Sequence, residues 1–198
     1  MIRKVVAIVG SYRKGGVTES AVEAVLEGAR ANGAATQMIR LNDCELNFCT
    51  NCRKCTQAPG EERGVCAQGD DLEQILVAVE SADAVVLASP VNYYNVTALY
   101  RRFLERLLGY AYWPWGQNAP KTRTKKQPRK AVLVATSGAP GFLIPLLTGA
   151  ASALRLSAKM LGAKPVANLW IGLAAGEPNH QLSQHALERA RRAGLKLA

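Results

Sequence analysis

The residues best suited to ligand chemistry lie in a polar loop near the start of the chain. This loop, GSYRKGGVTES over residues 10–20, follows an apolar run and leads into a segment with helical spacing of apolar residues. Hydroxyls, a guanidinium and the unpaired N–H groups of a helix N-terminus all bind phosphate. A hydrophilic turn capped by Thr18 is the alternative, and the loop matches neither GxGxxG nor Walker A. The predicted phosphate ligands are Ser11, Arg13, Thr18 and Ser20.

A second chemical feature is a group of thiols further along the chain. Three cysteines stand in CTNCRKC and a fourth follows after a longer gap: Cys49, Cys52, Cys55 and Cys66. Four thiolates are the number that a [4Fe-4S] cluster needs, and a structural zinc accepts the same set. The third interpretation, free thiols in a loop near the ligand site or an oligomer interface, is the one we expect, although the spacing leaves all three open. Cys44 lies outside the motif and is expected to pack in the interior.

Two further loops contain residues that suit a planar ligand. In SPVNYYNVTALYRRFLER, residues 89–106, Pro90 is expected to end a strand and turn the chain. Tyr93 and Tyr94 then offer flat apolar surfaces with polar tips, for a ring or for packing under a helix. In TSGAPG, residues 136–141, small side chains let backbone N–H groups approach a ligand, with a simple turn as the alternative.

The elements that must position these loops follow from hydrophobic periodicity. Continuous apolar runs, typical of strands buried on both faces, predict strands at residues 5–10, 36–41, 84–89, 131–136 and 166–171. Helical spacing predicts helices at residues 17–31, from Asp71 onward, and at 97–108, 147–161 and 183–197.

This alternation of strands and helices predicts a single α/β domain over residues 1–198, a doubly wound five-stranded parallel sheet between helical layers. In such sheets the ligand lies outside the carboxyl ends of the strands. The loops after Gly10, Ser89 and Thr136 are therefore expected to form one site.

Composition limits the class of protein and its surroundings. The 198 residues are 48% hydrophobic and carry a formal net charge of +10, as expected of an ordinary folded chain rather than a disordered one. No stretch approaches the roughly 20 apolar residues of a membrane span. The five cysteines fit a reducing compartment, so a cytoplasmic location and no membrane partner are expected.

The net positive charge is compatible with three classes of partner: nucleic acid, a membrane surface or small anions. Its densest part, KTRTKKQPRK over residues 121–130, is predicted to be a solvated surface loop because it lacks apolar periodicity and contains Pro128. Attraction of a phosphorylated substrate is the next alternative, and nucleic-acid binding is the one that this pattern favours least.

The order of these loops is similar to that of a known family. The segments GSYRKGGVTES, CTNCRKC with Cys66 and Asp70–Asp71, SPVNYYNVTALYRRFLER and ATSGAPG resemble the NADPH-dependent FMN reductase family of flavodoxin-like proteins. They also resemble the iron-sulfur flavoproteins within that larger group. The likeness covers roughly residues 5–141, and the later elements fit only by pattern.

The resemblance implies a flavodoxin-like fold that binds FMN. It places the phosphate in the first loop and the isoalloxazine ring against the second and third. The implied cofactor-binding residues are Ser11, Arg13, Val17, Thr18, Glu19, Ser20, Pro90, Val91, Asn92, Tyr93, Tyr94, Asn95, Ser137, Gly138 and Ala139. Family members often have tyrosine where this chain has Asn92, so which tyrosine covers the ring stays open.

The implied activity is that of an NAD(P)H oxidoreductase that passes electrons through FMN to a small acceptor such as a flavin or a quinone. No catalytic side chain is required, because the cofactor carries the chemistry. One alternative is an iron-sulfur flavoprotein electron carrier with a [4Fe-4S] cluster on the four cysteines. Another is a non-enzymatic nucleic-acid-binding protein that keeps the fold. A homodimer or homotetramer is also implied, with YAYWPWG, residues 110–116, as a candidate contact.

Overall fold

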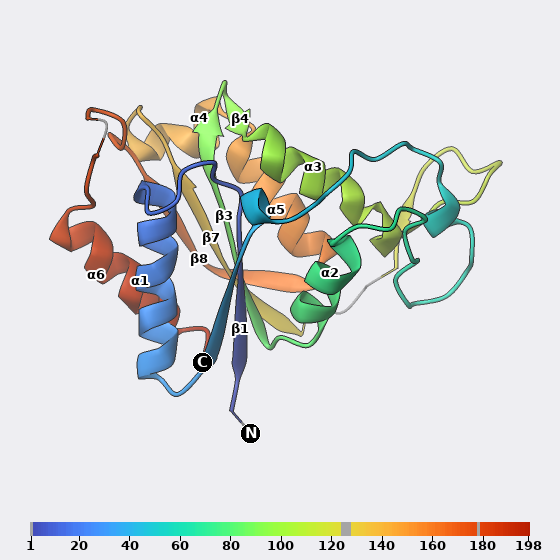
Figure 1. Ribbon diagram of the computed structural model, residues 1–198, viewed down its shortest axis with the longest axis horizontal. Helices are drawn as coiled ribbons and strands as arrows, with labels where there is room; N and C mark the ends of the chain where they lie inside the picture. Colours follow the sequence, from blue (N-terminus) through green and yellow to red (C-terminus); the bar gives the residue numbers. More distant parts are fainter. Residues whose placement is uncertain (1, 124–127, 178) are drawn as a thin grey trace.

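The computed structural model, which describes residues 2–123, 128–177 and 179–198, has a parallel sheet between two layers of helices (Figure 1). The sheet order is β2-β1-β3-β7-β8, with the short β4 antiparallel to the end of β3. This confirms the predicted doubly wound parallel sheet of five strands. The main strands are β1 Lys4–Val9, β2 Ala35–Arg40, β3 Ala84–Asn92, β4 Asn95–Val96, β7 Arg129–Thr136 and β8 Ala163–Ile171, and β5 Ala111–Tyr112 pairs with β6 Lys121–Thr122.

Helices cover both faces of the sheet (Figure 1). One layer holds α1 Val17–Ala31 and α6 Gln184–Leu195; the other holds α2 Leu72–Glu80, α3 Ala98–Arg106, α4 Ile144–Leu147 and α5 Ala150–Met160. Short 3-10 helices lie at η1 Leu41–Asp43, η2 Lys54–Thr56, η3 Leu107–Tyr110 and η4 Gly141–Leu143. The helix predicted at 147–161 is α5, which begins later, at Ala150, because Thr148 and Gly149 separate it from the one-turn α4.

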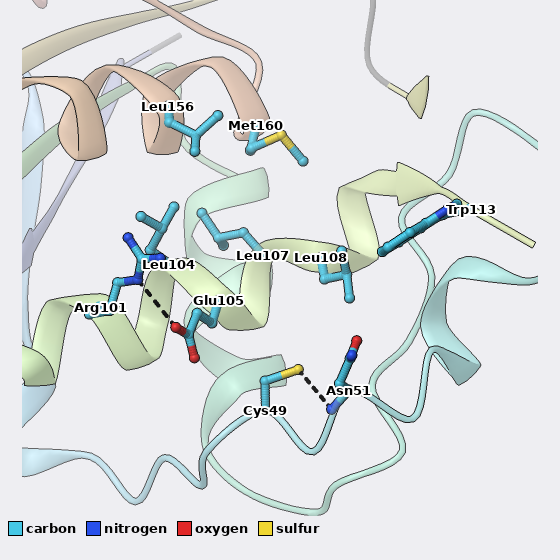
Figure 2. A pocket seen from close by; sticks show the side chains of 10 residues that line it. All are labelled: Cys49, Asn51, Arg101, Leu104, Glu105, Leu107, Leu108, Trp113, Leu156 and Met160. Carbon is cyan, nitrogen blue, oxygen red and sulfur yellow. Dashed lines mark hydrogen bonds and ion pairs between the residues drawn. The ribbon is translucent and has the colours of Figure 1, made fainter. Parts of the chain in front are cut away.

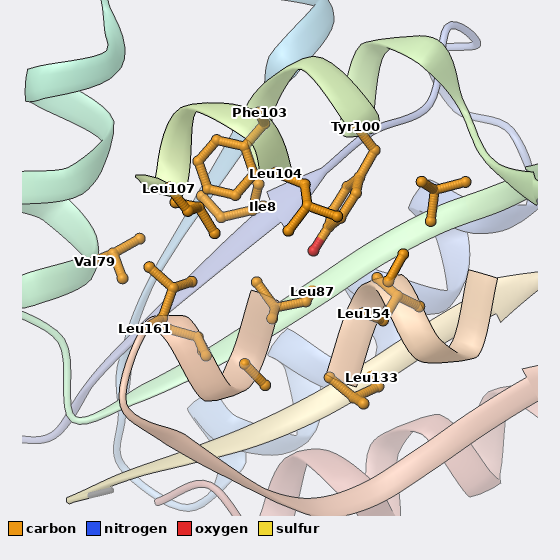
Figure 3. Close-up of a cluster of buried hydrophobic side chains, with 14 of the residues drawn as sticks. Ile8, Val79, Leu87, Tyr100, Phe103, Leu104, Leu107, Leu133, Leu154 and Leu161 are labelled. Atoms are coloured by element: carbon orange, nitrogen blue, oxygen red, sulfur yellow. The ribbon is translucent and has the colours of Figure 1, made fainter. Parts of the chain in front are cut away.

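The apolar runs build two cores because side chains alternate between the faces of each strand. In β1, Val5, Ala7 and Val9 pack toward α1 and α6. Val6 and Ile8 pack in the other core, toward α2, α3 and α5. Figure 3 shows this second core, in which Tyr100 and Phe103 of α3 lie over the sheet. The half-buried Cys44 packs against it, as predicted.

The expectation that Pro90 ends a strand was wrong. Pro90 does not end β3, which continues to Asn92 and pairs Pro90 with Thr136 of β7. The pairing of β1 with β3 stops at Val9–Ala88. No ladder hydrogen bond from β1 is therefore lost at the proline, which lacks an N–H group.

The basic segment 121–130 was predicted to be a solvated loop, and neither of its described ends is one. Arg123 is buried and donates to the carbonyl oxygens of Gly60 and Ala58, among others, at 2.9 and 2.8 Å. Arg129 begins β7 and donates to the Glu80 carbonyl at 2.7 Å. Residues 124–127 lie outside the described part, so the expectation stands untested there.

Within the described ranges, no single helix has the length and apolar composition of a membrane span. The bent pair Gly141–Leu147 and Ala150–Met160 meets the criterion only when its two pieces are joined.

The helix that begins at the polar loop is held by a close crossing with the last helix. A Cβ atom added at Gly194 of α6 would overlap the Val25 carbonyl of α1, and one added at Gly28 would overlap the Arg191 carbonyl. Glycine at both positions lets the backbones approach, so that α6 supports α1.

We expect Gly194→Ala to destabilise the protein. Alanine in a helix normally stabilises by about 0.5–1 kcal/mol relative to glycine, but the overlap here should reverse the sign and cost about 2 kcal/mol or more. Urea unfolding measures the change. Gly69→Ala is the control, because an added Cβ at Gly69 meets nothing; equal stability of Gly194→Ala and wild type would contradict the close crossing.

Candidate functional site at the carboxyl edge of the sheet

A cavity of about 390 Å³ opens where β1, β3 and β7 end. Its walls come from the loops after these strands and from the loop after β8. The lining residues are Ser11, Tyr12, Arg13, Gly16, Val17, Thr18, Pro90, Val91, Asn92, Thr136, Ser137, Gly138, Ala174 and Ala175. The structure thus brings the three predicted loops together at one edge.

The first loop presents backbone donors and one cation to the cavity. The α1 hydrogen-bond ladder begins with Ser20 N–H donating to the Gly16 carbonyl at 2.9 Å, and no side chain caps the helix at Gly16. The N–H groups of Val17, Thr18 and Glu19 precede that ladder and are left for a ligand. Arg13 is exposed and belongs to none of the salt bridges among the described residues.

Thr18 is not the helix cap that the simpler interpretation required. Gly16 takes the N-cap position, and the buried Thr18 hydroxyl lies 2.7 Å from the Thr136 hydroxyl. This bond joins the first loop to the end of β7. Ser11 Oγ accepts from the Arg13 N–H at 3.2 Å and so fixes the turn that carries the guanidinium.

The side chains of Glu19 and Ser20 point elsewhere. They line a separate depression beside α6, together with Arg40. Arg40 donates to Glu19 at 2.6 Å, and this hydrogen bond holds the pKa of the Glu19 carboxyl below its ordinary value. The Ser20 hydroxyl donates weakly to the Gly15 carbonyl at 3.5 Å. Of these two residues, only Glu19 has a backbone N–H left for a ligand, because the Ser20 N–H donates to the Gly16 carbonyl.

The second loop is a hairpin rather than a turn into the helix. Pro90, Val91 and Asn92 line the cavity, whereas Tyr93 and Tyr94 form the two-residue tip between β3 and β4. Both tyrosines have positive φ, 44° and 64°, as in a type I′ turn. Their side chains are 99% and 71% exposed and are not among the residues that line the cavity.

Asn95 also lies outside the cavity lining. It packs against the start of α5, where a Cβ atom added at Gly149 would lie 2.6 Å from its amide nitrogen. The Tyr94 carbonyl accepts from the Gly149 N–H at 2.8 Å. These contacts hold the hairpin against the second helical layer.

The third loop contributes Ser137 and Gly138 to the lining, and the adjacent Ala139 N–H donates to Ser137 Oγ at 3.0 Å. Sequence reasoning missed the loop after β8, which supplies Ala174 and Ala175. Its residues 172–176, GLAAG, carry the same small-residue signal as TSGAPG. Tyr12 and Thr136, which flank predicted residues, were also missed.

One buried threonine connects the ends of two strands. The Thr97 hydroxyl donates to the Gly10 carbonyl at 2.7 Å and accepts from the Tyr100 N–H at 3.0 Å, which caps α3. The Thr97 N–H donates to Ser89 Oγ at 3.1 Å. The first and second loops are therefore held in a fixed relation by hydrogen bonds that water does not reach.

This arrangement suits FMN. Uncapped helix N–H groups and a guanidinium can bind the phosphate, and the small residues of the β7 and β8 loops leave the backbone open to a flat ring. No side chain of the cavity lining is an Asp, Glu, His, Lys or Cys. The site can bind and orient a cofactor, but it offers no strong acid or base.

The cysteines lie in a different region, over an irregular loop near the far end of α3. Cys52 is exposed, and the Lys54 N–H lowers its thiol pKa. Burial raises the pKa of Cys55, and the neighbouring thiols raise it further. Among the residues that the structure describes, no three His, Cys, Asp or Glu side chains are arranged to hold a metal. As they stand, the thiols do not fit a cluster.

Arginine side chains fix this loop to the rest of the fold. Arg106 of α3 donates to Asp70 at 2.6 and 3.0 Å and to Cys66 Sγ at 3.3 Å. The guanidinium carbon of the half-buried Arg53 lies over two indole rings, 3.8 Å from the centroid of Trp113 and 4.2 Å from that of Trp115. The aromatic segment 110–116 therefore packs largely on its own subunit.

We expect Asp70→Asn to destabilise the protein by about 3 kcal/mol at neutral pH, because it leaves the Arg106 guanidinium buried without its counter-charge. The side chains of this pair are 1% and 2% exposed. Burial, the largest single effect, would raise the pKa of Asp70, but the hydrogen bonds from Arg106 and from two backbone N–H groups, together with the Arg106 charge, outweigh it and the net pKa is lowered.

The stability that this carboxylate contributes is present above the ordinary Asp pKa and is lost as the pH falls through the lowered folded value. Urea unfolding at neutral and acid pH should show this loss in wild type and not in Asp70→Asn. Asp43→Asn removes an exposed partner of Lys14 and should change stability by less than about 1 kcal/mol. Equal effects of the two substitutions would contradict the anchoring role of Asp70.

Comparison with curated proteins finds iron-sulfur flavoproteins among the relatives. One from Archaeoglobus fulgidus is 37% identical over 111 residues, which is 56% of this chain and 48% of the relative. One from Methanocaldococcus jannaschii is 36% identical over 103 residues, which is 52% of this chain and 51% of the relative. The matched part is thus about half of each relative.

Solved structures share the fold at low identity. An azoreductase from Bacillus anthracis superposes with a TM-score of 0.73 at 16% identity, covering 98% of this chain and all of that one. An NAD(P)H:quinone oxidoreductase from Methanothermobacter marburgensis gives 0.70 at 20% identity over the full length of both chains. An archaeal flavodoxin gives 0.58 at 14% identity, covering 98% of this chain and 96% of that one. The flavodoxin-like fold is confirmed.

The family resemblance is confirmed as well. The model of the NADPH-dependent FMN reductase family matches residues 3–176, a range that contains all four loops around the cavity. This chain belongs to the NADPH-dependent FMN reductase family.

Proposed function

We propose that this protein is an FMN-dependent NAD(P)H oxidoreductase that passes electrons from a nicotinamide, through bound FMN, to a small acceptor. The observation that carries the proposal is the uncapped N-terminus of α1, which opens beside Arg13 into the cavity at the carboxyl edge of the sheet. The family and an FMN-bound azoreductase from Bacillus anthracis with the same fold, TM-score 0.72, support the choice of cofactor.

The phosphate end of the proposed site is the first loop. Arg13 supplies a charge-assisted contact, Ser11 a hydroxyl, and residues 17–19 the backbone N–H groups at the helix N-terminus. An anion is stabilised here by unpaired N–H groups and by the positive end of the helix dipole. The dipole adds most in the first turn, which is where these residues lie.

The ring end of the proposed site comprises Pro90, Val91 and Asn92 on one side and Ser137, Gly138 and Ala139 with Ala174 and Ala175 on the other. FMN itself supplies the hydride and electron chemistry. The chain positions the ring, shields it from water, and offers backbone N–H groups that favour negative charge on it. Stacking of Tyr93 or Tyr94 on the ring stays a prediction, because their side chains lie outside the cavity lining.

The acceptor is proposed only as a class, a small flavin, quinone or similar molecule. Names of proteins with this fold, a quinone oxidoreductase and azoreductases, are consistent with that class. The net charge of +10 favours anionic dinucleotides through electrostatic steering. Five free cysteines support a reducing compartment, the cytoplasm, as the location.

We expect Arg13→Ala to weaken FMN binding by about ten- to a hundredfold, because a hydrogen bond to a charged group contributes about 1.5–3 kcal/mol. Riboflavin, which lacks the phosphate, should lose little. Fluorescence titration of apo protein with both flavins measures the difference.

Lys14→Ala is the matched control for this experiment. It removes the same charge from the same loop, but Lys14 pairs with Asp43 at 3.0 Å, so FMN binding should change much less. If Arg13→Ala lowers the affinity for FMN and riboflavin equally, Arg13 does not contact the phosphate and the assignment fails.

The second candidate function is an iron-sulfur flavoprotein electron carrier with a [4Fe-4S] cluster on Cys49, Cys52, Cys55 and Cys66. The names of the curated relatives favour it, and the arrangement of the thiols does not. We expect protein purified without oxygen to contain less than one iron per chain and to keep its reductase activity. About four irons per chain, lost together in a Cys55→Ser variant, would favour the carrier instead.

A further inference from the structure

A second cavity besides the cofactor cavity has room for a flat ring. It has a volume of about 430 Å³ and lies between α3, α5 and the cysteine loop. Figure 2 shows its mostly apolar walls, in which leucines of α3 and η3 face α5, with an indole beside them: Leu104, Leu107, Leu108, Leu156, Met160 and Trp113. Arg101 also lines this α3–α5 cavity but is paired with Glu105 at 3.2 Å. A phosphate would have to compete with Glu105 for that cation.

The cofactor cavity has an aromatic wall of its own in Tyr12. This residue stands in the first loop between Ser11 and Arg13, lines the cavity, and is 51% exposed. Tyr93 and Tyr94 of the hairpin tip, in contrast, lie outside the lining. A planar ligand that enters the cavity therefore meets the ring of Tyr12 rather than those of the tip.

A hydrogen bond fixes Tyr12 against the start of α3. The Leu99 N–H donates to the Tyr12 hydroxyl oxygen at 3.2 Å, in the first turn of the helix, where N–H groups lack partners within the helix. The next N–H, that of Tyr100, donates to the Thr97 hydroxyl at 3.0 Å. Two side-chain oxygens from different segments thus cap α3, and one of them comes from the phosphate loop.

This bond directs the Tyr12 side chain from one end of the cavity toward the other. The Tyr12 backbone belongs to the first loop, whereas α3 follows the second loop, where Ser89 Oγ accepts from the Thr97 N–H at 3.1 Å. The side chain therefore runs from the proposed phosphate ligands toward the strand end that carries Pro90 and Val91. In FMN a ribityl chain joins the phosphate to the isoalloxazine, so a side chain with this course reaches the flavin beyond its phosphate.

The phenol also keeps a donor for a ligand. A tyrosine hydroxyl has one O–H donor besides its acceptor lone pairs, and the bond from Leu99 uses only a lone pair. A hydroxyl that accepts one hydrogen bond donates the next more strongly, because the two bonds polarise each other. Flavins carry ring carbonyls and ribityl hydroxyls, and the oxygens of both accept such a bond.

We propose that Tyr12 is the aromatic residue that contacts the flavin, with its ring packed on the isoalloxazine and its hydroxyl donating to a flavin oxygen. The inference rests on the proposed FMN site and divides recognition between two neighbouring residues. Arg13 recognises the phosphate, which riboflavin lacks, and Tyr12 recognises the part that FMN and riboflavin share. The bond from Leu99 holds the Tyr12 side chain in place before the ligand arrives, which reduces the conformational entropy lost on binding.

Titration of apo protein with FMN and with riboflavin tests this division. Tyr12→Phe keeps the ring and removes the hydroxyl, so it should weaken both flavins equally, by about 3- to 10-fold. Tyr12→Leu also removes the aromatic contact and should weaken both by about 10- to 100-fold. Leu156→Arg is the control for the α3–α5 cavity: Leu156 is 49% exposed, and both affinities should stay at their wild-type values.

The emission of the bound flavin distinguishes direct contact from support of the fold. A phenol or an indole in contact with an excited flavin quenches its emission by transferring an electron that then returns, whereas a benzene ring does not. Wild type should therefore bind FMN with quenched emission, Tyr12→Phe should bind it with bright emission, and Tyr12→Trp should restore the quenching. Tyr112→Phe is the matched control, because Tyr112 of β5 lines neither cavity, and it should stay quenched.

Equal quenching in wild type and Tyr12→Phe overturns the proposal, as does a loss of affinity in Tyr12→Phe that is confined to FMN. Bright emission in Tyr93→Phe or Tyr94→Phe alone would assign the ring contact to the hairpin tip instead. Loss of both flavins in Leu156→Arg would assign the ring to the α3–α5 cavity. Each of these results leaves the proposed FMN-dependent oxidoreductase standing, whereas a wild type that binds neither flavin contradicts the proposed function and the assignment of Tyr12 together.

Discussion

Parallel strands end at a common edge, and this constraint determines the geometry of the cofactor cavity. The loops after β1, β3 and β7 must leave the sheet side by side, and α1 begins at that edge with N–H groups that precede its hydrogen-bond ladder. Thr97 ties Gly10 to Ser89, and Thr18 ties α1 to Thr136, through buried hydrogen bonds. The anion binding that we propose would rest on these fixed backbone groups, which need little reorganisation when a ligand arrives.

A different kind of interaction holds the cysteine loop, which has little regular structure. Guanidinium groups take the place of strand pairing there: Arg123 donates to carbonyl oxygens, Arg106 donates to Asp70, and the half-buried Arg53 lies over two indole rings. Carbonyls, a carboxylate or aromatic faces compensate each of these cations, which limits the penalty of removing it from water. The loop thereby brings Cys49 to the side of the α3–α5 cavity.

Hydrophobic periodicity was enough to predict the sheet and the helix at residues 17–31, because β1, β3 and β7 are apolar on both faces and α1 has one apolar stripe. It failed at Pro90. There β3 extends beyond the end of its neighbour β1, so the missing N–H of the proline leaves no hydrogen bond unmade. Tyr93 and Tyr94 form a turn that usually takes Asn-Gly, so no local signal marked it. The buried Arg123 was missed because its partners are backbone carbonyls distant in sequence.

The cofactor assignment rests on the backbone at the start of α1, and hydrogen–deuterium exchange of the wild-type protein with and without FMN reports on that backbone directly. The account predicts that FMN slows exchange in residues 10–20 most strongly, with smaller protection in residues 89–92, 136–139 and 172–175. Exchange in the cysteine loop, residues 44–66, should be unchanged by the flavin. Protection centred on the cysteine loop or on the groove between α3 and α5, with residues 10–20 unaffected, would contradict it.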